Sequence, residues 1–212
     1  MTEPTVSLII PTTGRASLKD ALESLMGQPW CDGDQVIVVC DGDCRVAVEW
    51  FCSRHVPFDW CLSILQGPHR DWGGIARTRG LKLARAGWLA FLDDDDWWIE
   101  NSLSKIRAAI EAMPDHPHFF RMARPGYGDL VWRSSEAKRS NVSLQNFICP
   151  NWPKSLGKFT SRYEADWDFI ESTLALMPPL PLGAWHDDVI CYWGRTPGTP
   201  EEENARKLQG IG

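Results

Sequence analysis

Four consecutive aspartates, residues 93–96, follow an apolar run at 88–92 and precede two tryptophans. Neighbouring carboxylates repel one another, and burying them together requires a compensating positive charge. Mg²⁺ and Mn²⁺ are hard cations that prefer carboxylate oxygens and commonly share their coordination with substrate phosphates. The run therefore indicates a divalent cation bound together with a nucleoside diphosphate. A solvated turn that caps the following helix is the simpler alternative.

Other metal and phosphate sites do not fit this run. In an EF-hand loop beginning at Asp93, Trp98 would replace the required glycine and Ser104 the closing glutamate. The chain also lacks the G-x-G-x-x-G of dinucleotide-binding folds and the G-x-x-x-x-G-K-[ST] of phosphate-binding loops. A cation held by carboxylates remains the reading that accounts for the four charges.

A second acidic group, Glu164, Asp166 and Asp168, lies where a loop is predicted to enter a helix. A hydroxyl group becomes an effective nucleophile when a carboxylate accepts its proton in the transition state. One of these acids could therefore serve as a general base. The alternative is that they only stabilise the positive end of the helix dipole.

Alternating strands and helices position these residues. The first half predicts strands at 6–10, 36–40, 63–65 and 88–92, and helices at 18–26, 45–54, 73–85 and 99–113. This order predicts an α/β fold with a mostly parallel, doubly wound sheet. Ligands of such sheets bind beyond the carboxyl ends of the strands. The loops at 12–15, 41–43 and 93–96 each follow a strand, so we expect them to meet at one rim.

The second half is less regular. It predicts a hairpin from strands at 118–123 and 130–133, a strand at 143–149, a helix at 169–177 and a last strand at 189–193. We expect one domain over residues 1–193, whose second half, 101–193, completes the site opened by residues 1–100. The tail at 194–212, rich in proline, glutamate and glycine, should be loosely held.

Composition narrows the class of protein. The 212-residue chain carries a net charge of -6, which does not indicate a global attraction to nucleic acid or anionic membranes. Its seven cysteines form no C-x-x-C pair and are odd in number, as expected for reduced thiols. The N-terminus lacks a basic region and a long apolar run, and no segment predicts a transmembrane helix. We therefore expect a cytoplasmic protein.

Four segments together carry a resemblance. They are SLIIPTTGRASLKDALESLMGQ, VIVVCDGD, GGIARTRGLKLARAGWLAFLDDDDWW and RYEADWDFI. In this order and spacing they resemble the family-2 glycosyltransferases of the GT-A fold, including the small, stand-alone kind that also occurs in phages. The resemblance implies a Rossmann-like GT-A sheet with a smaller acceptor-side β/α part. It covers roughly residues 5–175, and the four segments taken together are specific for this family.

The resemblance also implies roles on the donor side. Residues that would bind the nucleotide sugar are Thr12, Arg15, Asp41, Arg77, Asp93 and Asp94. Asp93 and Asp95 match the D-x-D motif of the family, so Asp95 would bind Mn²⁺ or Mg²⁺ directly and Asp93 would contribute to the metal or the ribose. His186, late in the chain, would be a further metal ligand. A solvent-facing helical arginine and a structural histidine are the simpler readings of Arg77 and His186.

On the acceptor side, the family has a Glu-Asp pair before an aromatic residue, whereas here Ala165 separates Glu164 from Asp166. We favour Asp166 as the base because Trp167 follows it, with Glu164 second and Asp168 third. Trp97, Trp98 and Trp152 are candidates to stack on a sugar, although tryptophan more often packs in a core.

The leading hypothesis is a metal-dependent glycosyltransferase that moves a sugar, favoured to come from a UDP-sugar, to an acceptor hydroxyl with inversion. Other hypotheses are a nucleotidyltransferase that makes nucleotide sugars and a non-catalytic nucleotide-sugar or glycan-binding module. The acceptor could be a glycan, a small molecule or DNA with hydroxymethylated bases. For DNA, a basic cluster could contact phosphates. The cluster comprises Arg121, Arg124, Arg133, Lys138 and Arg139.

Overall fold

A parallel sheet forms the first half of the computed structural model, which describes residues 3–123, 130–131, 134–177 and 183–194. Its strands are β1 (Val6–Thr12), β2 (Gln35–Asp41), β3 (Asp59–Leu65) and β4 (Trp88–Phe91), in the order β3-β2-β1-β4. Strands β1, β2 and β4 are mostly apolar and buried along their whole length, as coverage of both faces requires, whereas the edge strand β3 is largely exposed. The predicted doubly wound α/β sheet is therefore confirmed.

The second half extends the same sheet with mixed strand directions. The order continues from β4 through β8 (Phe147–Pro150), β6 (His118–Ala123) and β9 (Ala184–Tyr192) to β5 (Trp97–Trp98). Strand β8 runs antiparallel to β4 and β6, whereas β6 and β9 are parallel. A short strand β7 (Leu130–Val131) pairs antiparallel with β6, as the predicted hairpin requires.

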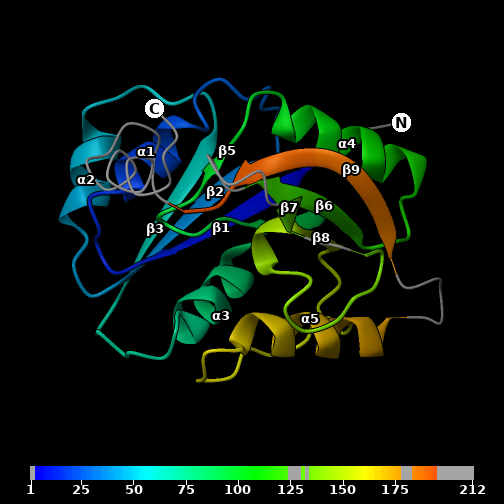
Figure 1. Cartoon of the computed structure of the whole chain (residues 1–212). Coiled ribbons are helices and arrows are strands. Elements are labelled where there is room, and N and C mark those ends of the chain that lie inside the picture. The colour runs from blue at the N-terminus through cyan, green and yellow to red at the C-terminus, as the bar shows by residue number, and fades with distance from the viewer. Residues whose placement is uncertain (1–2, 124–129, 132–133, 178–182, 195–212) are drawn as a thin grey trace, which may run out of the picture.

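Helices cover both faces of the sheet (Figure 1). On one face lie α1 (Leu18–Glu23), α2 (Arg45–Cys52) and α4 (Ser102–Ala112); on the other lie α3 (Gly74–Leu83) and α5 (Ala165–Leu176). The core divides accordingly. Along β1, Leu8 and Ile10 pack in the first layer and Ile9 packs in the second, since successive strand side chains point to opposite faces.

The structure corrects several predicted boundaries. Residues 144–146 of the predicted strand at 143–149 form a 3₁₀ helix, η1 (Leu144–Asn146), in which Asn146 and Ser143 form a capping box. Helix α5 begins at Ala165, four residues before the predicted start, because apolar spacing does not mark its acidic first turn. Strand β9 begins five residues early, and β5 was not predicted. The proposed turn at 125–128 and the tail at 195–212 lie outside the described residues.

Helix α3 packs unusually close to β1. A Cβ atom on Gly80 would lie 2.4 Å from Cγ2 of Ile9, closer than side chains approach one another. Glycine at this position therefore lets the helix rest against the sheet and fixes the position of Arg77 one turn earlier. No helix in the described part of the chain is long and apolar enough to span a membrane.

Candidate active site

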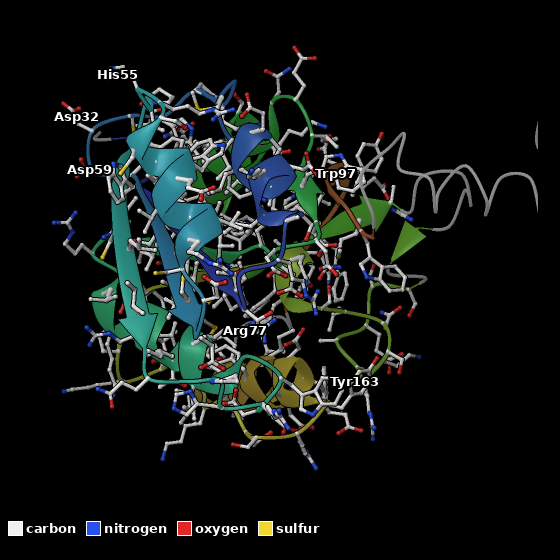
Figure 2. All side chains as sticks on the ribbon, turned by 90° about the vertical axis from the view of Figure 1, so that its left-hand side faces the viewer. Asp32, His55, Asp59, Arg77, Trp97 and Tyr163 are labelled. Atoms are coloured by element: carbon white, nitrogen blue, oxygen red, sulfur yellow. The ribbon has the colours of Figure 1, made fainter. Side chains whose placement is uncertain are left out.

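The loops that follow β1, β2 and β4 meet at the carboxyl rim of the sheet, around a pocket of about 420 Å³. In Figure 2, Asp59 marks the beginning of β3 and Arg77 lies near the opposite ends of the strands. The predicted donor-side residues border this pocket; they are Thr12, Arg15, Asp41, Arg77, Asp93, Asp94 and Asp95. The rim that topology predicted from the sequence is therefore formed.

The loop after β1 holds the middle of the acidic run. The Thr12 hydroxyl donates to Oδ2 of Asp94 at 2.6 Å and accepts the backbone N–H of Gly14 at 2.9 Å. Nη1 of Arg15 lies 2.8 Å from Oδ2 of Asp95 and 3.5 Å from Oδ1 of Asp94. Burial nevertheless raises the pKa of Asp94. Asp94 thus links β1 to the loop, and Asp95 stays partly exposed at the pocket.

Asp41, at the end of β2, is buried and already has partners. Its Oδ2 accepts the backbone N–H of His69 at 2.9 Å, and its Oδ1 lies 2.5 Å from Nδ1 of the same histidine. A Cβ on Gly67 would lie 2.0 Å from Oδ1 of Asp41, so glycine is needed for this approach. Asp41 therefore orders the loop after β3 as well as bordering the pocket.

Arg77 lies in the first turns of α3 with only 5% of its surface exposed. Its Nη2 donates to Oδ1 of Asp93 at 2.6 Å, and its Nη1 donates to the carbonyl of Trp72 at 2.7 Å. Oδ1 of Asp166 lies 3.5 Å from Nη1. Burial opposes the charge of Arg77, but the carboxylates of Asp93 and Asp166 outweigh it and raise the pKa of Arg77. This guanidinium thus joins the two acidic groups and is no solvent-facing helical arginine.

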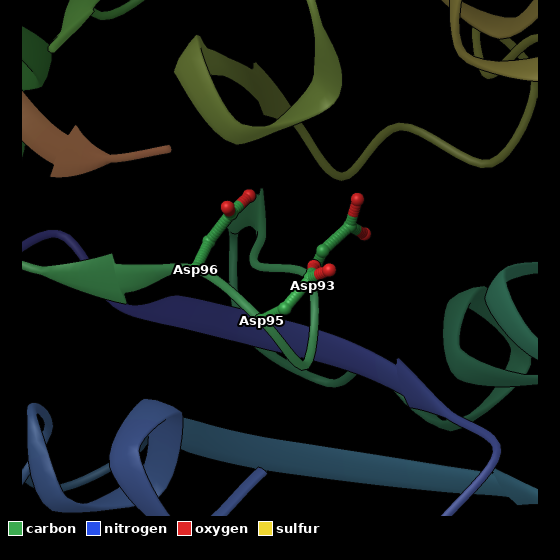
Figure 3. A group of neighbouring side chains, drawn as sticks. All are labelled: Asp93, Asp95 and Asp96. Atoms are coloured by element: carbon green, nitrogen blue, oxygen red, sulfur yellow. The ribbon is translucent and has the colours of Figure 1, made fainter. Parts of the chain in front are cut away.

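The side chains of Asp93, Asp95 and Asp96 project from the same side of the loop between β4 and β5 (Figure 3). One carboxylate oxygen from each lies within 4.8 Å of the others. Oδ1 of Asp96 accepts the backbone N–H of Gly194 at 2.9 Å, but its buried Oδ2 has no partner among the described residues. Burial, with the charge of Asp93 second, raises the pKa of Asp96 well above its usual value. The group is short of positive charge, which is the requirement that a cation would meet.

The second acidic group separates into different environments. Asp166 lies largely buried near Arg77; burial raises its pKa to about 6, with Arg77 opposing and Asp93 adding to the shift. Glu164 is held by Arg139, and Asp168 accepts hydrogen bonds from Arg162 and Thr160. Hydrogen bonds from Arg162 lower the pKa of Asp168. Of the three acids, Asp166 is the one that lies against the donor-side residues.

His186 does not lie at the acidic group of Asp93, Asp95 and Asp96. On β9, its Nε2 is 3.0 Å from Nδ1 of His118, and its ring stacks on Phe120 at 4.6 Å. It is not among the described residues that gather around Asp93 as possible metal ligands. Burial lowers the pKa of His118 to about 3 and lowers that of His186, so both imidazoles are neutral at pH 7. The two histidines lie on the adjacent strands β6 and β9.

The three tryptophans proposed to stack on a sugar do not border the pocket. Trp98 is buried in the core, Trp97 packs against Tyr192 at 5.5 Å, and Trp152 lies after β8. The sequence reading missed other residues that do belong to the site. Gln145 on η1 donates to Oδ2 of Asp93. Pocket-lining residues that it also missed are Asp71, Trp72, Tyr163 and Trp193. The signals near them were the glycine pair at 73–74, which opens α3, and the segment RYEADWDFI, which contains Tyr163.

Comparison with known proteins decides the family. The model of glycosyl transferase family 2 matches residues 7–169. The chain belongs to this family. A glycosyltransferase of Haemophilus influenzae, named as uncharacterized, is 26% identical over 154 residues, which cover 69% of this chain and 49% of the relative. The chain thus spans about half the length of that relative.

Solved structures support the same fold. TarS of S. aureus in complex with UDP has a TM-score of 0.71 at 18% identity, covering 91% of this chain and 61% of TarS 1-349. The complex of TarS with UDP-GlcNAc has a TM-score of 0.72 at 18% identity, over 92% of this chain and 60% of TarS 1-349. At such identities the likeness is one of fold, and it confirms the predicted GT-A architecture.

Proposed function

We propose that the chain catalyses metal-dependent transfer of a sugar from a nucleoside diphosphate sugar to an acceptor hydroxyl. The observation that carries this proposal is the group of Asp93, Asp95 and Asp96, of which Asp93 and Asp95 border the pocket. Arg77 connects Asp93 of this group to Asp166. The family, and the UDP and UDP-GlcNAc complexes of TarS, support a UDP-sugar as the donor. The first-choice donor is therefore UDP-linked.

The acidic group fits Mn²⁺ or Mg²⁺. Its donor atoms are all carboxylate oxygens, which both cations prefer, and Asp96 has a buried oxygen without a partner among the described residues. Asp95 and Asp93 would hold the cation, as the D-x-D resemblance implies, and Asp96 would be the third ligand in place of His186. When bound, the cation would stabilise the negative charge of the departing diphosphate.

Donor-side residues have separate tasks in this proposal. Thr12 and Arg15 hold Asp94 and Asp95 in place, and Asp41 orders the loop against which the nucleotide would lie. Arg77 is positively charged and buried, so it would neutralise diphosphate charge when the donor displaces part of its contact with Asp93. Each of these contacts exists before the donor binds, which lowers the cost of organising the site.

Asp166 would be the general base. Its Oδ1 lies 3.5 Å from Nη1 of Arg77, and a carboxylate with a pKa of about 6 is ionised at pH 7 yet basic enough to accept a proton. It would take the proton of the acceptor hydroxyl as the oxygen attacks the anomeric carbon and the diphosphate leaves. A single displacement of this kind inverts the anomeric centre. Glu164 and Asp168 are less suited because each accepts a direct hydrogen bond from an arginine, whereas Asp166 lies 3.5 Å from Arg77.

The pairing of basic side chains in the described part of the chain is relevant to the chemical class of the acceptor. Of the basic cluster suggested for DNA, Arg121 pairs with Asp187, and Lys138 pairs with Glu136. Arg139 pairs with Glu164, whereas Arg124 and Arg133 lie outside the described residues. Paired cations attract phosphates weakly, so a hydroxylated glycan or small molecule is favoured over modified DNA.

Release of nucleoside diphosphate tests the proposal. UDP-, GDP- and dTDP-sugars would be incubated with the protein and Mn²⁺, Mg²⁺ or EDTA, alongside an Asp166→Asn variant. We expect slow hydrolysis of one donor with metal and none with EDTA, and loss of acceptor-dependent transfer in Asp166→Asn. Absence of donor binding with every metal would refute the transferase assignment. Tight donor binding without turnover on any acceptor would instead support a binding module.

A further inference from the structure

Two exposed aromatic rings stand at the mouth of the pocket. Trp72 is 61% exposed and Tyr163 is 75% exposed, yet both border the pocket. Their rings meet edge to face at 5.2 Å and 86°. Tyr163 precedes α5 and lies on the same side of the molecule as Arg77 (Figure 2). Large aromatic side chains usually lose most of their exposure on folding, so a pair left open beside a pocket marks a binding surface.

The backbone holds Trp72 in this position at a cost. Its φ is 60°, in the left-handed region, which a bulky residue rarely adopts. The carbonyl of Trp72 accepts the hydrogen bond from Nη1 of Arg77 at 2.7 Å, which fixes the peptide. Strained residues persist where the surroundings enforce them, and they concentrate at ligand-binding sites. The conformation therefore presents the indole ring to the pocket.

A buried carboxylate beside Trp72 lacks a complete set of partners. Asp71 is 6% exposed and borders the same pocket. Its Oδ2 accepts the backbone N–H of Ile75 at 2.5 Å, whereas its buried Oδ1 has no partner within the described part of the chain. Buried polar atoms almost always have a partner. A hydroxyl group bound in the pocket would supply one by donating to this oxygen.

We propose that Trp72, Tyr163 and Asp71 form the acceptor subsite, and that the acceptor is an uncharged pyranoside. This inference rests on the proposed function, because it names the substrate that the Asp166 base would deprotonate. Aromatic faces carry partial negative charge and attract the C–H groups on the apolar face of a pyranose ring. Asp71 would accept a ring hydroxyl. Thus the subsite offers both contacts that a neutral sugar needs.

The position of the subsite agrees with this assignment. Tyr163 precedes Asp166 by three residues, and the Trp72 carbonyl shares the Arg77 guanidinium with Asp166. Asp166 is not among the residues that border the pocket, and Arg77 connects it to the subsite. The pocket is bordered by five aspartates and also by Arg15, Arg70 and Arg77, a mixture of charges that suits the donor diphosphate with its cation. The uncharged character of the acceptor is inferred from the two rings and Asp71 alone.

The test measures binding of p-nitrophenyl pyranosides of glucose, galactose and N-acetylglucosamine by saturation-transfer NMR, with UDP and Mn²⁺ present throughout. Trp72→Ala, Tyr163→Ala and Tyr163→Phe are compared with Trp60→Ala. Trp60 is a matched control because it is 46% exposed on the edge strand β3, outside the pocket. UDP affinity is measured separately by calorimetry for every variant, so failure of the donor site is seen independently.

We expect one pyranoside to bind, with affinity about tenfold lower in Trp72→Ala and Tyr163→Ala, near normal in Tyr163→Phe and unchanged in Trp60→Ala. The loss for the pyranoside should exceed any loss for UDP. An equal loss for both ligands would assign the rings to the nucleotide and overturn the proposal. UDP binding without pyranoside binding, or salt-sensitive binding of a hydroxymethylated oligonucleotide instead, would also overturn it while leaving the donor site standing.

Discussion

In the described part of the chain, some buried aspartates at the carboxyl rim of the parallel sheet lack partners that a buried aspartate at the amino rim has. At the amino rim, Asp34 is fully buried, and its two oxygens accept the backbone N–H groups of Val6 and Cys31, each at 2.8 Å. Arg107 of α4 forms an ion pair with it and also donates to the carbonyl of Pro29 at 2.5 Å. At the carboxyl rim, Asp71 and Asp96 each keep a buried oxygen without a described partner.

This difference separates buried carboxylates that hold the fold together from those available to bind a ligand. A buried charge with a complete set of partners, such as Asp34, connects segments that are distant in the sequence, here β1, the loop before β2 and α4. A buried charge with incomplete partners costs stability and persists because something else uses it. Both rims contain aspartates after or before apolar strands, so residue type alone does not distinguish them. The contacts do.

Asp34→Ala should have the largest effect on stability. Removing this carboxylate leaves Arg107 buried without its ionic partner, and breaking such a pair costs about 3–5 kcal/mol. Urea unfolding followed by circular dichroism would measure the loss. Asp32→Ala, which removes an exposed carboxylate from the same loop, should change the free energy of unfolding by less than about 0.5 kcal/mol. Equal effects of the two substitutions would remove the contrast between the rims.

In contrast to Asp34→Ala, Asp95→Ala should reduce activity and leave stability nearly unchanged. We expect the rate of donor turnover to fall by about a hundredfold or more, which corresponds to about 3 kcal/mol, because the variant loses the metal ligand at the pocket. Its free energy of unfolding should stay within about 0.5 kcal/mol of the parent, because Asp95 is partly exposed and crowded by like charges. Asp187→Ala, an exposed partner of Arg121, is the control and should retain turnover. Near-normal activity of Asp95→Ala would contradict the metal assignment.

Much of the fold could be predicted because parallel strands leave a strong signal. Runs such as 8–10 and 36–40 are apolar throughout, since both faces of each strand are covered, and glycines mark the turns between strands and helices. The second half gave weaker signals. Residues 144–146 are buried but form a 3₁₀ helix, and the two-residue strand β5 depends on pairing with β9. Burial alone does not specify which element a short apolar segment forms.

The gathering of the donor-side candidates at one pocket could be predicted because they follow strands, and topology brings strand ends together. On the acceptor side the sequence pointed to Asp166 but not to the two exposed rings. Trp72 and Tyr163 lie in loops whose paths are set by tertiary contacts, among them the bond from Arg77 to the Trp72 carbonyl. His186 was misplaced for a similar reason: its neighbour His118 comes from an adjacent strand, which the sequence does not reveal.

Mn²⁺ should stabilise the protein through the carboxyl rim only. A ligand at a hundred times its Kd adds about 2.7 kcal/mol to the free energy of unfolding, which for a chain of this size raises Tm by about 5–10 °C. Differential scanning fluorimetry with Mn²⁺ and with EDTA would measure the shift. The shift should be lost in Asp95→Ala and reduced in Asp96→Asn, but retained in Asp32→Ala. A full shift in Asp95→Ala would mean that the ion binds elsewhere.

The pH dependence of transfer offers the smallest and most specific effect. Burial raises the pKa of Asp166 to about 6, so the folded protein holds its proton more tightly than the unfolded chain does. Two consequences have opposite signs. Transfer requires the ionised base, so kcat/KM should fall about tenfold for each pH unit below about 6. The ionised carboxylate is destabilising when buried, so Asp166 should contribute more favourably to stability as pH falls through 6 toward 4.

Asp166→Asn separates these consequences from acid effects elsewhere in the chain. The variant should lose the limb in the rate profile near pH 6, keep only residual transfer, and unfold with a weaker dependence on pH over the same interval. Asp168→Asn is the matched comparison, because hydrogen bonds from Arg162 lower the pKa of Asp168 rather than raise it. A limb near pH 6 that survives in Asp166→Asn would assign the base to another residue. The metal site proposed at the carboxyl rim would be unaffected by that result, and a role for another acid on the acceptor side would have to be found.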